Sequence, residues 1–368
     1  MSGNGTAGSC SRALCPPSGE RLSLSADPDL SPAAAPDGLS EGSLRLPGRL
    51  ALFHGGALQD AEFAWRLTGP AGLPVVLAMG GISASRKVFT DDGGKGGWWD
   101  AVVGPGRALD SRHVRILGID YLGGSGASTG PLAGASFPTL SSHDQAAAVL
   151  QLMDHLGLPK LRAIVGASYG GMVALAFGLK YPQRVERLIV ISASDSAHPM
   201  ATAWRSVQRS IVRFGLKSGR AVEGMELARA LAMSTYRSPE EFAARFRGAP
   251  RLDGVHPVFP VEEYLFARGR DYATRYLPES FVCLSESIDL HRVDATQIPV
   301  PTDVVAVRED QLVPLADMRA LAARLPNAHF HELSSLHGHD AFLKEAEQLK
   351  PIFVALSGHA TTLESDFD

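Results

Sequence analysis

The sequence predicts an α/β protein with a mostly parallel sheet, helices on both faces and a helical lid insertion. Short runs that are apolar throughout, such as residues 74–79, are typical of parallel strands buried on both faces. Strand and helix patterns alternate along much of the chain, as a parallel sheet requires. This alternation lapses over residues 198–297, where one helical pattern follows another.

The first half of the core leads to a glycine-rich turn. Residues 50–54 and 61–67 alternate apolar and polar side chains on either side of two glycines, which predicts an antiparallel hairpin. Buried strands are then predicted over 74–79, 114–120, 162–165 and 185–192, with helices over 142–156 and 172–181. Gly157 and Pro182 follow these helices, where such residues are expected to end them.

The second half begins with the insertion, whose predicted helices cover residues 203–214, 221–233, 239–246 and 261–275. The core returns with a strand over 302–307, a helix over 315–325, a strand over 328–333 and a helix over 341–356. The predicted core is therefore 46–197 together with 298–357, and the lid insertion is 198–297.

Both ends of the chain are expected to be disordered. Residues 1–45 are rich in Ser, Pro, Gly and Ala and have little apolar surface to offset the entropy of ordering. A start codon assigned too far upstream explains this leader equally well. Residues 358–368 are expected to form a disordered tail.

Composition excludes several classes of protein. In 368 residues, 35 Lys and Arg stand against 39 Asp and Glu, a net charge of −4 that argues against nucleic-acid binding. No apolar run approaches a membrane span, and the N-terminus lacks the apolar region of a secretory signal. The three cysteines favour a reducing cytoplasm over a disulfide scaffold, and no spacing suggests a metal site.

The strongest chemical motif is Gly166-Ala-Ser168-Tyr-Gly170-Gly171. It lies between a predicted strand and a predicted helix, which is the setting of a nucleophile elbow. The glycines permit the tight turn, and Ser168 would lie at its tip as the nucleophile. The alternative is a glycine-rich turn whose serine only caps the helix.

A serine nucleophile needs a base and an acid that orients the base, and in this fold they follow in the order Ser, acid, His. Asp310 leaves the end of a predicted strand and is the favoured acid, with Glu309 and Asp303 as competitors. His339 directly precedes the last predicted helix and is the favoured base, with His337 as its rival.

An oxyanion hole needs two backbone N–H groups aimed at one point. Tyr169, which follows the nucleophile, is expected to supply one of them. The second is expected from the turn at residues 80–83, where Ile82 is favoured.

From about residue 50 to residue 356 the chain resembles the homoserine O-acyltransferases of the α/β-hydrolase fold. The resemblance lies in the segments GWWD (97–100), DYLGG (120–124), ASTGP (127–131), GASYGGM (166–172), TYRS (235–238), DQLVP (310–314) and GHDAF (338–342). It implies a triad of Ser168, Asp310 and His339. It also implies Arg237 for the carboxylate of homoserine and Asp340 for its ammonium group.

The resemblance further implies methionine biosynthesis and a homodimer formed through the helical insertion. The expected reaction is a ping-pong transfer from an acyl-coenzyme A to the hydroxyl of L-homoserine through a serine ester, with no permanently bound cofactor or metal. The insertion would cover the site, so that the bound alcohol outcompetes water.

The pattern is closest to the succinyl-transferring branch, which predicts succinyl-CoA as donor. A succinyl chain ends in a carboxylate and needs a cation; the candidates are Arg308, Arg205 and Arg209. The alternatives are acetyl-CoA as donor, L-serine as acceptor, a serine hydrolase acting on an ester, and a catalytically inactive binding protein.

Overall fold

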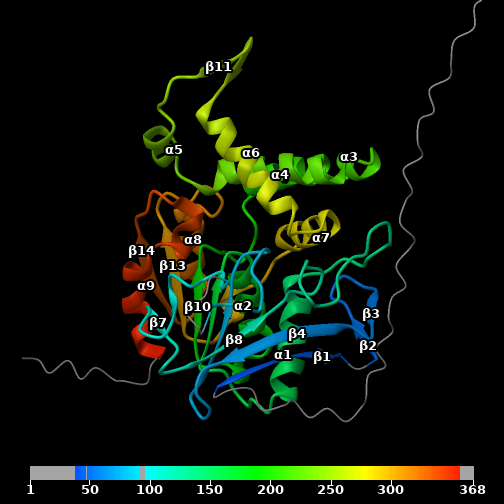
Figure 1. The fold of residues 1–368 in the computed structure, drawn as a ribbon. Helices are drawn as coiled ribbons and strands as arrows, with labels where there is room; N and C mark the ends of the chain where they lie inside the picture. Colours follow the sequence, from blue (N-terminus) through cyan, green and yellow to red (C-terminus); the bar gives the residue numbers. More distant parts are fainter. Residues whose placement is uncertain (1–37, 47, 91–95, 357–368) are drawn as a thin grey trace, which may run out of the picture. The chain divides into compact units, whose positions relative to one another are not determined.

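The computed structural model describes residues 38–46, 48–90 and 96–356. Its centre is an eight-stranded sheet with the strand order β1-β4-β8-β5-β9-β10-β13-β14 (Figure 1). Strand β4 pairs antiparallel with β1 and β8, whereas the remaining neighbours in the sheet are parallel. The predicted α/β fold with a mostly parallel sheet is confirmed.

Four central strands of the sheet, β5, β9, β10 and β13, are buried along their whole length, as their largely apolar sequences predict. The strands of the sheet are β1 (Leu39–Arg45), β4 (Glu62–Thr68), β5 (Val75–Met79), β8 (Arg115–Ile119), β9 (Ala163–Ala167), β10 (Leu188–Ile191), β13 (Thr302–Val307) and β14 (Ala328–Leu333).

Successive side chains of a strand point to opposite faces, so the sheet separates two hydrophobic cores. Leu77 and Met79 of β5 pack in one core with α1 (Ser142–His155), α2 (Tyr169–Lys180) and α8 (Leu315–Arg324). Val76 and Ala78 pack in the other core with α9 (Ala346–Phe353). Short strands β6 (Val103–Gly104) and β7 (Leu109–Asp110) also lie on that second face.

The inserted segment forms a lid with a small core of its own, built from Val212, Met225, Ala228, Tyr272 and Phe281. Figure 1 shows its helices lying across one end of the sheet. The elements of the lid are α3 (Pro199–Lys217), α4 (Ala221–Tyr236), α5 (Pro239–Arg245), β11 (Arg251–Asp253), β12 (His256–Val258), α6 (Pro260–Ala273) and α7 (Pro278–Asp289). Helix α7 and the β11–β12 hairpin were not predicted.

The prediction of a disordered leader over 1–45 is wrong for residues 39–45. These residues form β1, which pairs along its whole length with β4. Backbone hydrogen bonding holds this strand, and Gly42 leaves room for the ring of Trp65. Residues 1–37 and the predicted tail over 358–368 lie outside the described residues.

The predicted hairpin between residues 50–54 and 61–67 is also wrong. β2 (Arg49–Ala51) pairs instead with β3 (Ala57–Gln59), and β4 joins the main sheet. The predicted last helix divides as well, into a 3₁₀ helix at Gly338–Leu343, α9 and a final 3₁₀ turn at Val354–Leu356. In the described part of the chain, no helix is both long and apolar enough to cross a membrane.

Candidate active site

Ser168 lies at the sharp turn between β9 and α2, as the motif predicts. Its backbone has φ 54° and ψ −122°, a strained conformation for a residue with a side chain. The turn is closely packed: a Cβ on Gly166 would lie 2.2 Å from the carbonyl oxygen of Gly170, and one on Gly170 would lie 2.3 Å from that of Met79. Glycine is therefore required at both positions for steric reasons.

The three residues predicted as a triad lie in one hydrogen-bonded line. The Nε2 atom of His339 is 2.9 Å from Oγ of Ser168, and its Nδ1 atom is 2.7 Å from Oδ2 of Asp310. The other carboxylate oxygen of Asp310 accepts from the amides of Leu312 and Val313. Because Asp310 accepts the Nδ1 proton, Nε2 is left to accept the proton of Ser168.

The rival residues have other partners. Glu309 accepts from Ser334 and from the amide of Ser335, and Asp303 contacts Arg187 and His331. His337 contacts Arg237. The structure therefore brings together the favoured acid and base rather than their competitors.

The environment of His339 adjusts its basicity. Burial of the ring opposes protonation, but the charge of Asp310 and its hydrogen bond outweigh this effect, so the pKa of His339 is raised above its ordinary value of 6.5. A raised pKa makes the imidazole a stronger base toward the hydroxyl of Ser168.

The two amides expected to form an oxyanion hole flank Ser168. Tyr169 is the first residue of α2, and the turn that holds Ile82 passes beside the serine, since a Cβ on Gly81 would lie 3.9 Å from Oγ of Ser168. Gly170 N and the hydroxyl of Tyr121 both donate to the carbonyl of Gly80, which fixes the start of this turn. Within the described residues, neither the Ile82 nor the Tyr169 amide has a protein acceptor. Both donors thus remain available to a ligand.

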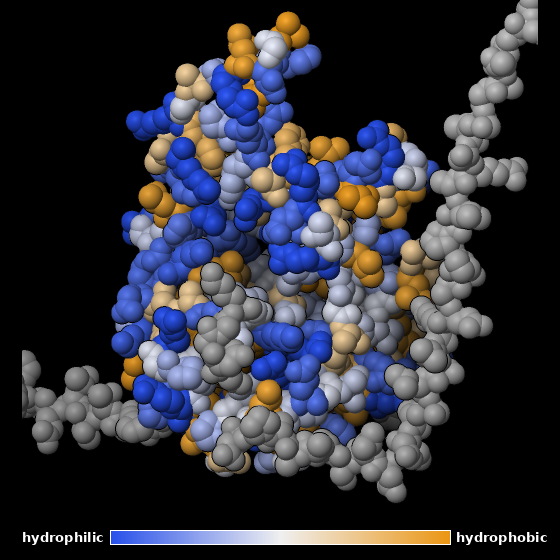
Figure 2. Space-filling view, in the orientation of Figure 1, coloured by the Kyte–Doolittle hydropathy of each residue, from blue (hydrophilic) through white to orange (hydrophobic). Residues whose placement is uncertain are grey.

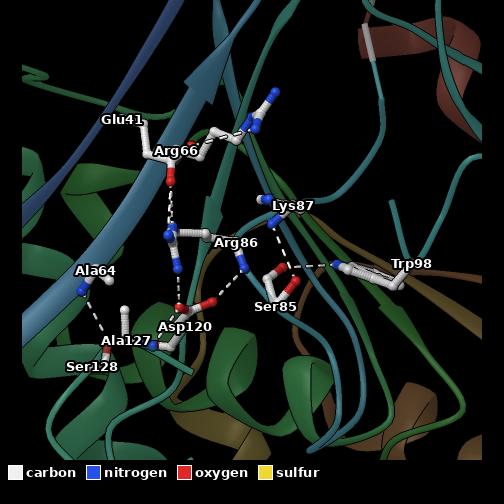
Figure 3. Close-up of polar contacts among 10 residues, drawn as sticks. All are labelled: Glu41, Ala64, Arg66, Ser85, Arg86, Lys87, Trp98, Asp120, Ala127 and Ser128. Carbon is white, nitrogen blue, oxygen red and sulfur yellow. Dashed lines mark hydrogen bonds and ion pairs between the residues drawn. The ribbon is translucent and has the colours of Figure 1, made fainter. Parts of the chain in front are cut away.

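A polar network anchors the far end of the same turn (Figure 3). Asp120 accepts from the backbone amide of Arg86 at 2.7 Å and from its guanidinium at 2.5 Å. Glu41 of β1 accepts two further hydrogen bonds from Arg86, and the indole of Trp98 donates to the carbonyl of Ser85. Strand β1, which the sequence did not predict, therefore helps to fix the segment that carries Ile82.

A cavity of about 240 Å³ opens over Ser168 and His339, between the core and the lid. Asp340 of the core and two lid arginines, Arg205 of α3 and Arg229 of α4, line it. Burial opposes the charge of Arg229, but Tyr236, Tyr272 and Asp340 favour it, and the pKa of Arg229 is raised overall. The cavity therefore combines a nucleophile with fixed charges of both signs.

Arg237, the residue implied for a substrate carboxylate, is absent from the cavity lining. Its Nε atom donates to Oδ2 of Asp340 at 3.1 Å and a terminal nitrogen lies 2.8 Å from Nδ1 of His337. Arg237 thus holds Asp340 in place, and the cation beside Asp340 in the cavity is Arg229. Sequence analysis missed Arg229, although it lies two helical turns before Tyr236 and so on the same face of α4.

Arg308, the candidate for acyl specificity, is likewise outside the cavity lining. Its side chain is 61% exposed and forms an ion pair with Glu332 of β14, because it leaves the sheet at the end of β13 and extends over the neighbouring strand. Arg209 is buried against Asp289 and Ser285, also outside the cavity lining. Among the three arginine candidates, only Arg205 lines the cavity.

No group of three His, Cys, Asp or Glu side chains within the described residues is placed to hold a metal ion. The site's own chemistry is that of a serine nucleophile, a histidine base and two amide donors. Fold and site together define a serine-dependent enzyme of the α/β-hydrolase class. In agreement, residues 74–346 match the model of the alpha/beta hydrolase fold family.

Comparison with known proteins narrows this class. The chain is 40% identical to a homoserine O-succinyltransferase of Xanthomonas campestris pv. campestris, over 89% of this chain and 85% of the relative. It is 37% identical to a homoserine O-acetyltransferase of Thermus thermophilus, over 71% and 72%. It is 31% identical to a serine O-succinyltransferase of Litchfieldella anticariensis, over 86% and 98%.

Among solved structures, a homoserine O-acetyltransferase from Bacillus anthracis superposes with a TM-score of 0.77 at 17% identity, covering 87% of this chain and 97% of that one. This match shows the fold alone. From the sequence relatives, the chain belongs to the homoserine O-acyltransferase family, and it is an acyltransferase.

Proposed function

We propose that this enzyme transfers a succinyl group from succinyl-CoA to the γ-hydroxyl of L-homoserine through a serine acyl-enzyme. One observation carries the proposal: Arg229 and Asp340 both line the cavity that contains Ser168. A zwitterionic amino acid needs one fixed cation and one fixed anion, whereas hydrolysis of a simple ester needs neither. Arg229 would bind the carboxylate of homoserine, and Asp340 its ammonium group.

The first half-reaction would acylate the enzyme. His339 takes the proton of Ser168 as Oγ attacks the thioester carbon, and the amides of Ile82 and Tyr169 stabilise the oxyanion. The carbon–sulfur bond then breaks, and the thiolate takes the proton from His339. The products are free coenzyme A and a succinyl ester on Ser168.

The second half-reaction would regenerate the enzyme. Homoserine enters, His339 removes the proton of its γ-hydroxyl, and the resulting oxygen attacks the ester carbon. The bond to Ser168 breaks, and Oγ recovers the proton from His339. The lid that covers the cavity limits the access of water, which would otherwise hydrolyse the ester.

The choice of donor and acceptor is the finer part of the proposal. Relatives named for succinyl and for acetyl transfer, and for homoserine and serine, all match the chain. Arg205 lines the cavity and favours succinyl-CoA as the donor. Its guanidinium would form an ion pair with the carboxylate at the end of a succinyl group, whereas an acetyl group carries no charge. Because a serine O-succinyltransferase is among the relatives, L-serine is the alternative acceptor.

We also propose that the enzyme works in the cytoplasm as a homodimer, without a bound cofactor or metal. The outer face of the lid supports the dimer: Val207 and Phe214 of α3 and Leu227 of α4 are apolar and exposed. Figure 2 shows apolar side chains in several places on the upper part of the molecule, where the lid lies.

The test is release of thiol from succinyl-CoA and from acetyl-CoA, each alone, with L-homoserine and with L-serine. We expect homoserine-dependent release from succinyl-CoA, with O-succinylhomoserine detected by mass spectrometry. Ser168→Ala is the control and should lose at least about 10³-fold in rate. Thiol release that does not depend on an amino acid would indicate a hydrolase and contradict the proposal. Homoserine-dependent release from acetyl-CoA but not from succinyl-CoA would contradict the choice of donor.

A further inference from the structure

Two arginines, Arg205 and Arg229, line the cavity together with two aspartates, Asp317 and Asp340. Arg229 of α4 lies beside Asp340, whose charge acts on it, and these two residues suffice for a zwitterion. Arg205 comes from a different helix, α3, and lines the same cavity. Its charge reaches His339, where it opposes protonation of the ring. A second cation close to the reacting groups therefore needs its own explanation.

We propose that Arg205, with Gln208 beside it, binds the distal carboxylate of a dicarboxylic acyl group while that group is attached to Ser168. This inference rests on the proposed function and extends it from the reaction to the residues that select the donor. The acyl chain would extend from Ser168 toward α3, and homoserine would occupy the side of the cavity near Arg229.

The first support is an imbalance of charge behind Arg205. Asp289 of α7 accepts from Arg205 through Nε at 2.8 Å and Nη2 at 2.6 Å, and both bonds end on Oδ1. The other oxygen, Oδ2, accepts from Arg209 at 2.5 Å. One carboxylate is thus shared by two guanidinium groups, so the cluster has a net positive charge at the cavity wall.

The geometry of Arg205 leaves it able to bind a second anion. A guanidinium has five N–H donors, and Asp289 uses only the Nε and Nη2 positions. Within the described part of the chain, the Nη1 nitrogen of Arg205 has no acceptor. Asp289 therefore orients the side chain and leaves its Nη1 donors available to a ligand.

Gln208 is the second, independent support. It lies three residues after Arg205 and hence on the same face of α3, and it also lines the cavity. The residue is 4% exposed, and no hydrogen bond joins its amide to another residue of the described structure. The amide N–H groups of Gln208 are therefore available to a carboxylate held by Arg205.

This arrangement would select the donor by the hydrogen bonds that its acyl group can accept. A succinyl carboxylate accepts from Nη1 of Arg205 and from the amide of Gln208, whereas an acetyl group has no group that can accept these bonds. The selection acts in the first half-reaction and leaves binding of homoserine unaffected.

The experiment compares kcat/KM for succinyl-CoA and acetyl-CoA, with L-homoserine saturating, in the full-length enzyme and in Arg205→Gln. We expect the value for succinyl-CoA to fall about 10- to 100-fold and that for acetyl-CoA to stay within about threefold. Gln208→Leu should change the ratio in the same direction by a smaller factor. The matched control is Arg213→Gln, two turns further along α3, whose partner is Glu286 on the exposed surface.

We expect the Arg205 variant to fold, because Asp289 still accepts hydrogen bonds from Arg209 and Thr202. Equal losses with both donors would overturn the inference and make Arg205 a structural residue. A raised KM for homoserine with unchanged donor preference would overturn it by assigning Arg205 to the acceptor. If the unaltered enzyme releases no thiol with homoserine from either donor, the proposed function fails first, and the inference falls with it.

Discussion

The Nε atom of Arg237 donates a hydrogen bond to Oδ2 of Asp340 at 3.1 Å, so two residues expected to bind opposite ends of one substrate instead bind each other. Arg237 is further tied to Nδ1 of His337 at 2.8 Å. Asp340 follows the catalytic histidine directly and lines the cavity. The ion pair therefore fixes the carboxylate of Asp340 next to the base, and Arg237 acts through Asp340 rather than on a substrate.

Asp340→Asn should raise KM for L-homoserine by about 10- to 100-fold, because the ammonium group loses a charged hydrogen-bond partner. Formation of the acyl-enzyme should stay within about threefold, since the donor does not use Asp340. Rapid-quench measurement of thiol release in the absence of acceptor separates the two steps. An equal loss in both steps would contradict the assignment of Asp340 to the acceptor.

Arg237→Gln should raise KM for homoserine less than Asp340→Asn does, because it frees the carboxylate without removing it. Arg245→Gln is the matched control: Arg245 also lies near Glu241, but its side chain is 47% exposed and has no contact with Asp340. We expect that control to match the unaltered enzyme in steady-state assays. If Arg237→Gln exceeded Asp340→Asn in its effect on KM, Arg237 would itself have to touch the substrate.

The triad could be predicted from sequence because each member is marked locally. Ser168 lies in a glycine-rich turn between strand and helix, and Asp310 and His339 follow strands in the order that the fold requires. The positions of arginine side chains could not be predicted in this way. Arg229 and Arg237 lie within eight residues of each other, and only tertiary packing decides which one lines the cavity.

Strand β1 shows a second limit of the sequence. Its residues have little apolar character, so their composition resembles that of the disordered leader before them. The strand is held by backbone pairing with β4 and by the contact between Glu41 and Arg86, and neither interaction has a local signal. Long-range pairing outweighed composition here, as it often does for strands at the edge of a sheet.

The rate should depend on the protonation of His339. The base must be neutral to accept the proton of Ser168, and its pKa is raised above 6.5, chiefly by the charge of Asp310 working against burial. As pH falls through that raised pKa, kcat/KM for the acyl donor should decrease tenfold per pH unit. A pH–rate profile of thiol release measures the midpoint. A midpoint below 6.5 would contradict the proposed environment of His339.

Asp310→Asn provides the matching variant for this profile. It removes the charge and the carboxylate acceptor that raise the pKa of His339, so the midpoint should shift to lower pH. The rate on the plateau should fall by roughly 10⁴-fold, because the imidazole is no longer held in the required tautomer. An unshifted midpoint would mean that the titrating group is not His339.

Gly170→Ala should abolish the folded nucleophile turn. The new Cβ would lie 2.3 Å from the carbonyl oxygen of Met79, and that atom is backbone in a central strand, so it cannot move aside cheaply. We expect a loss of about 3 kcal/mol or more in the free energy of unfolding, measured by urea denaturation. Gly248→Ala is the control, since its Cβ would find only an ordinary contact of 3.5 Å with Pro260. Comparable stability of the two variants would contradict the close packing of the turn.

His291 should make the protein less stable in mild acid. It is buried, with Nδ1 bonded to Oγ of Ser142 at 2.7 Å and Nε2 without a partner in the described structure. Burial, and then the neighbouring His143, lower its pKa to about 3. The unfolded chain therefore binds a proton below pH 6.5 that the folded protein does not bind, and the free energy of unfolding should fall by about 1.5 kcal/mol between pH 6.5 and 5.

The other perturbed histidines do not cancel this effect. His339 has a raised pKa, so its contribution changes mainly above pH 6.5, and below that pH it offsets only a small part of the loss caused by His291. His143 has a lowered pKa and adds to the slope in the same direction as His291. Urea denaturation at a series of pH values should show a smaller slope in His291→Asn, whose side chain can still reach Ser142. His329→Asn, on the exposed surface of β14, is the control substitution, and equal slopes in the two variants would contradict the role given to His291.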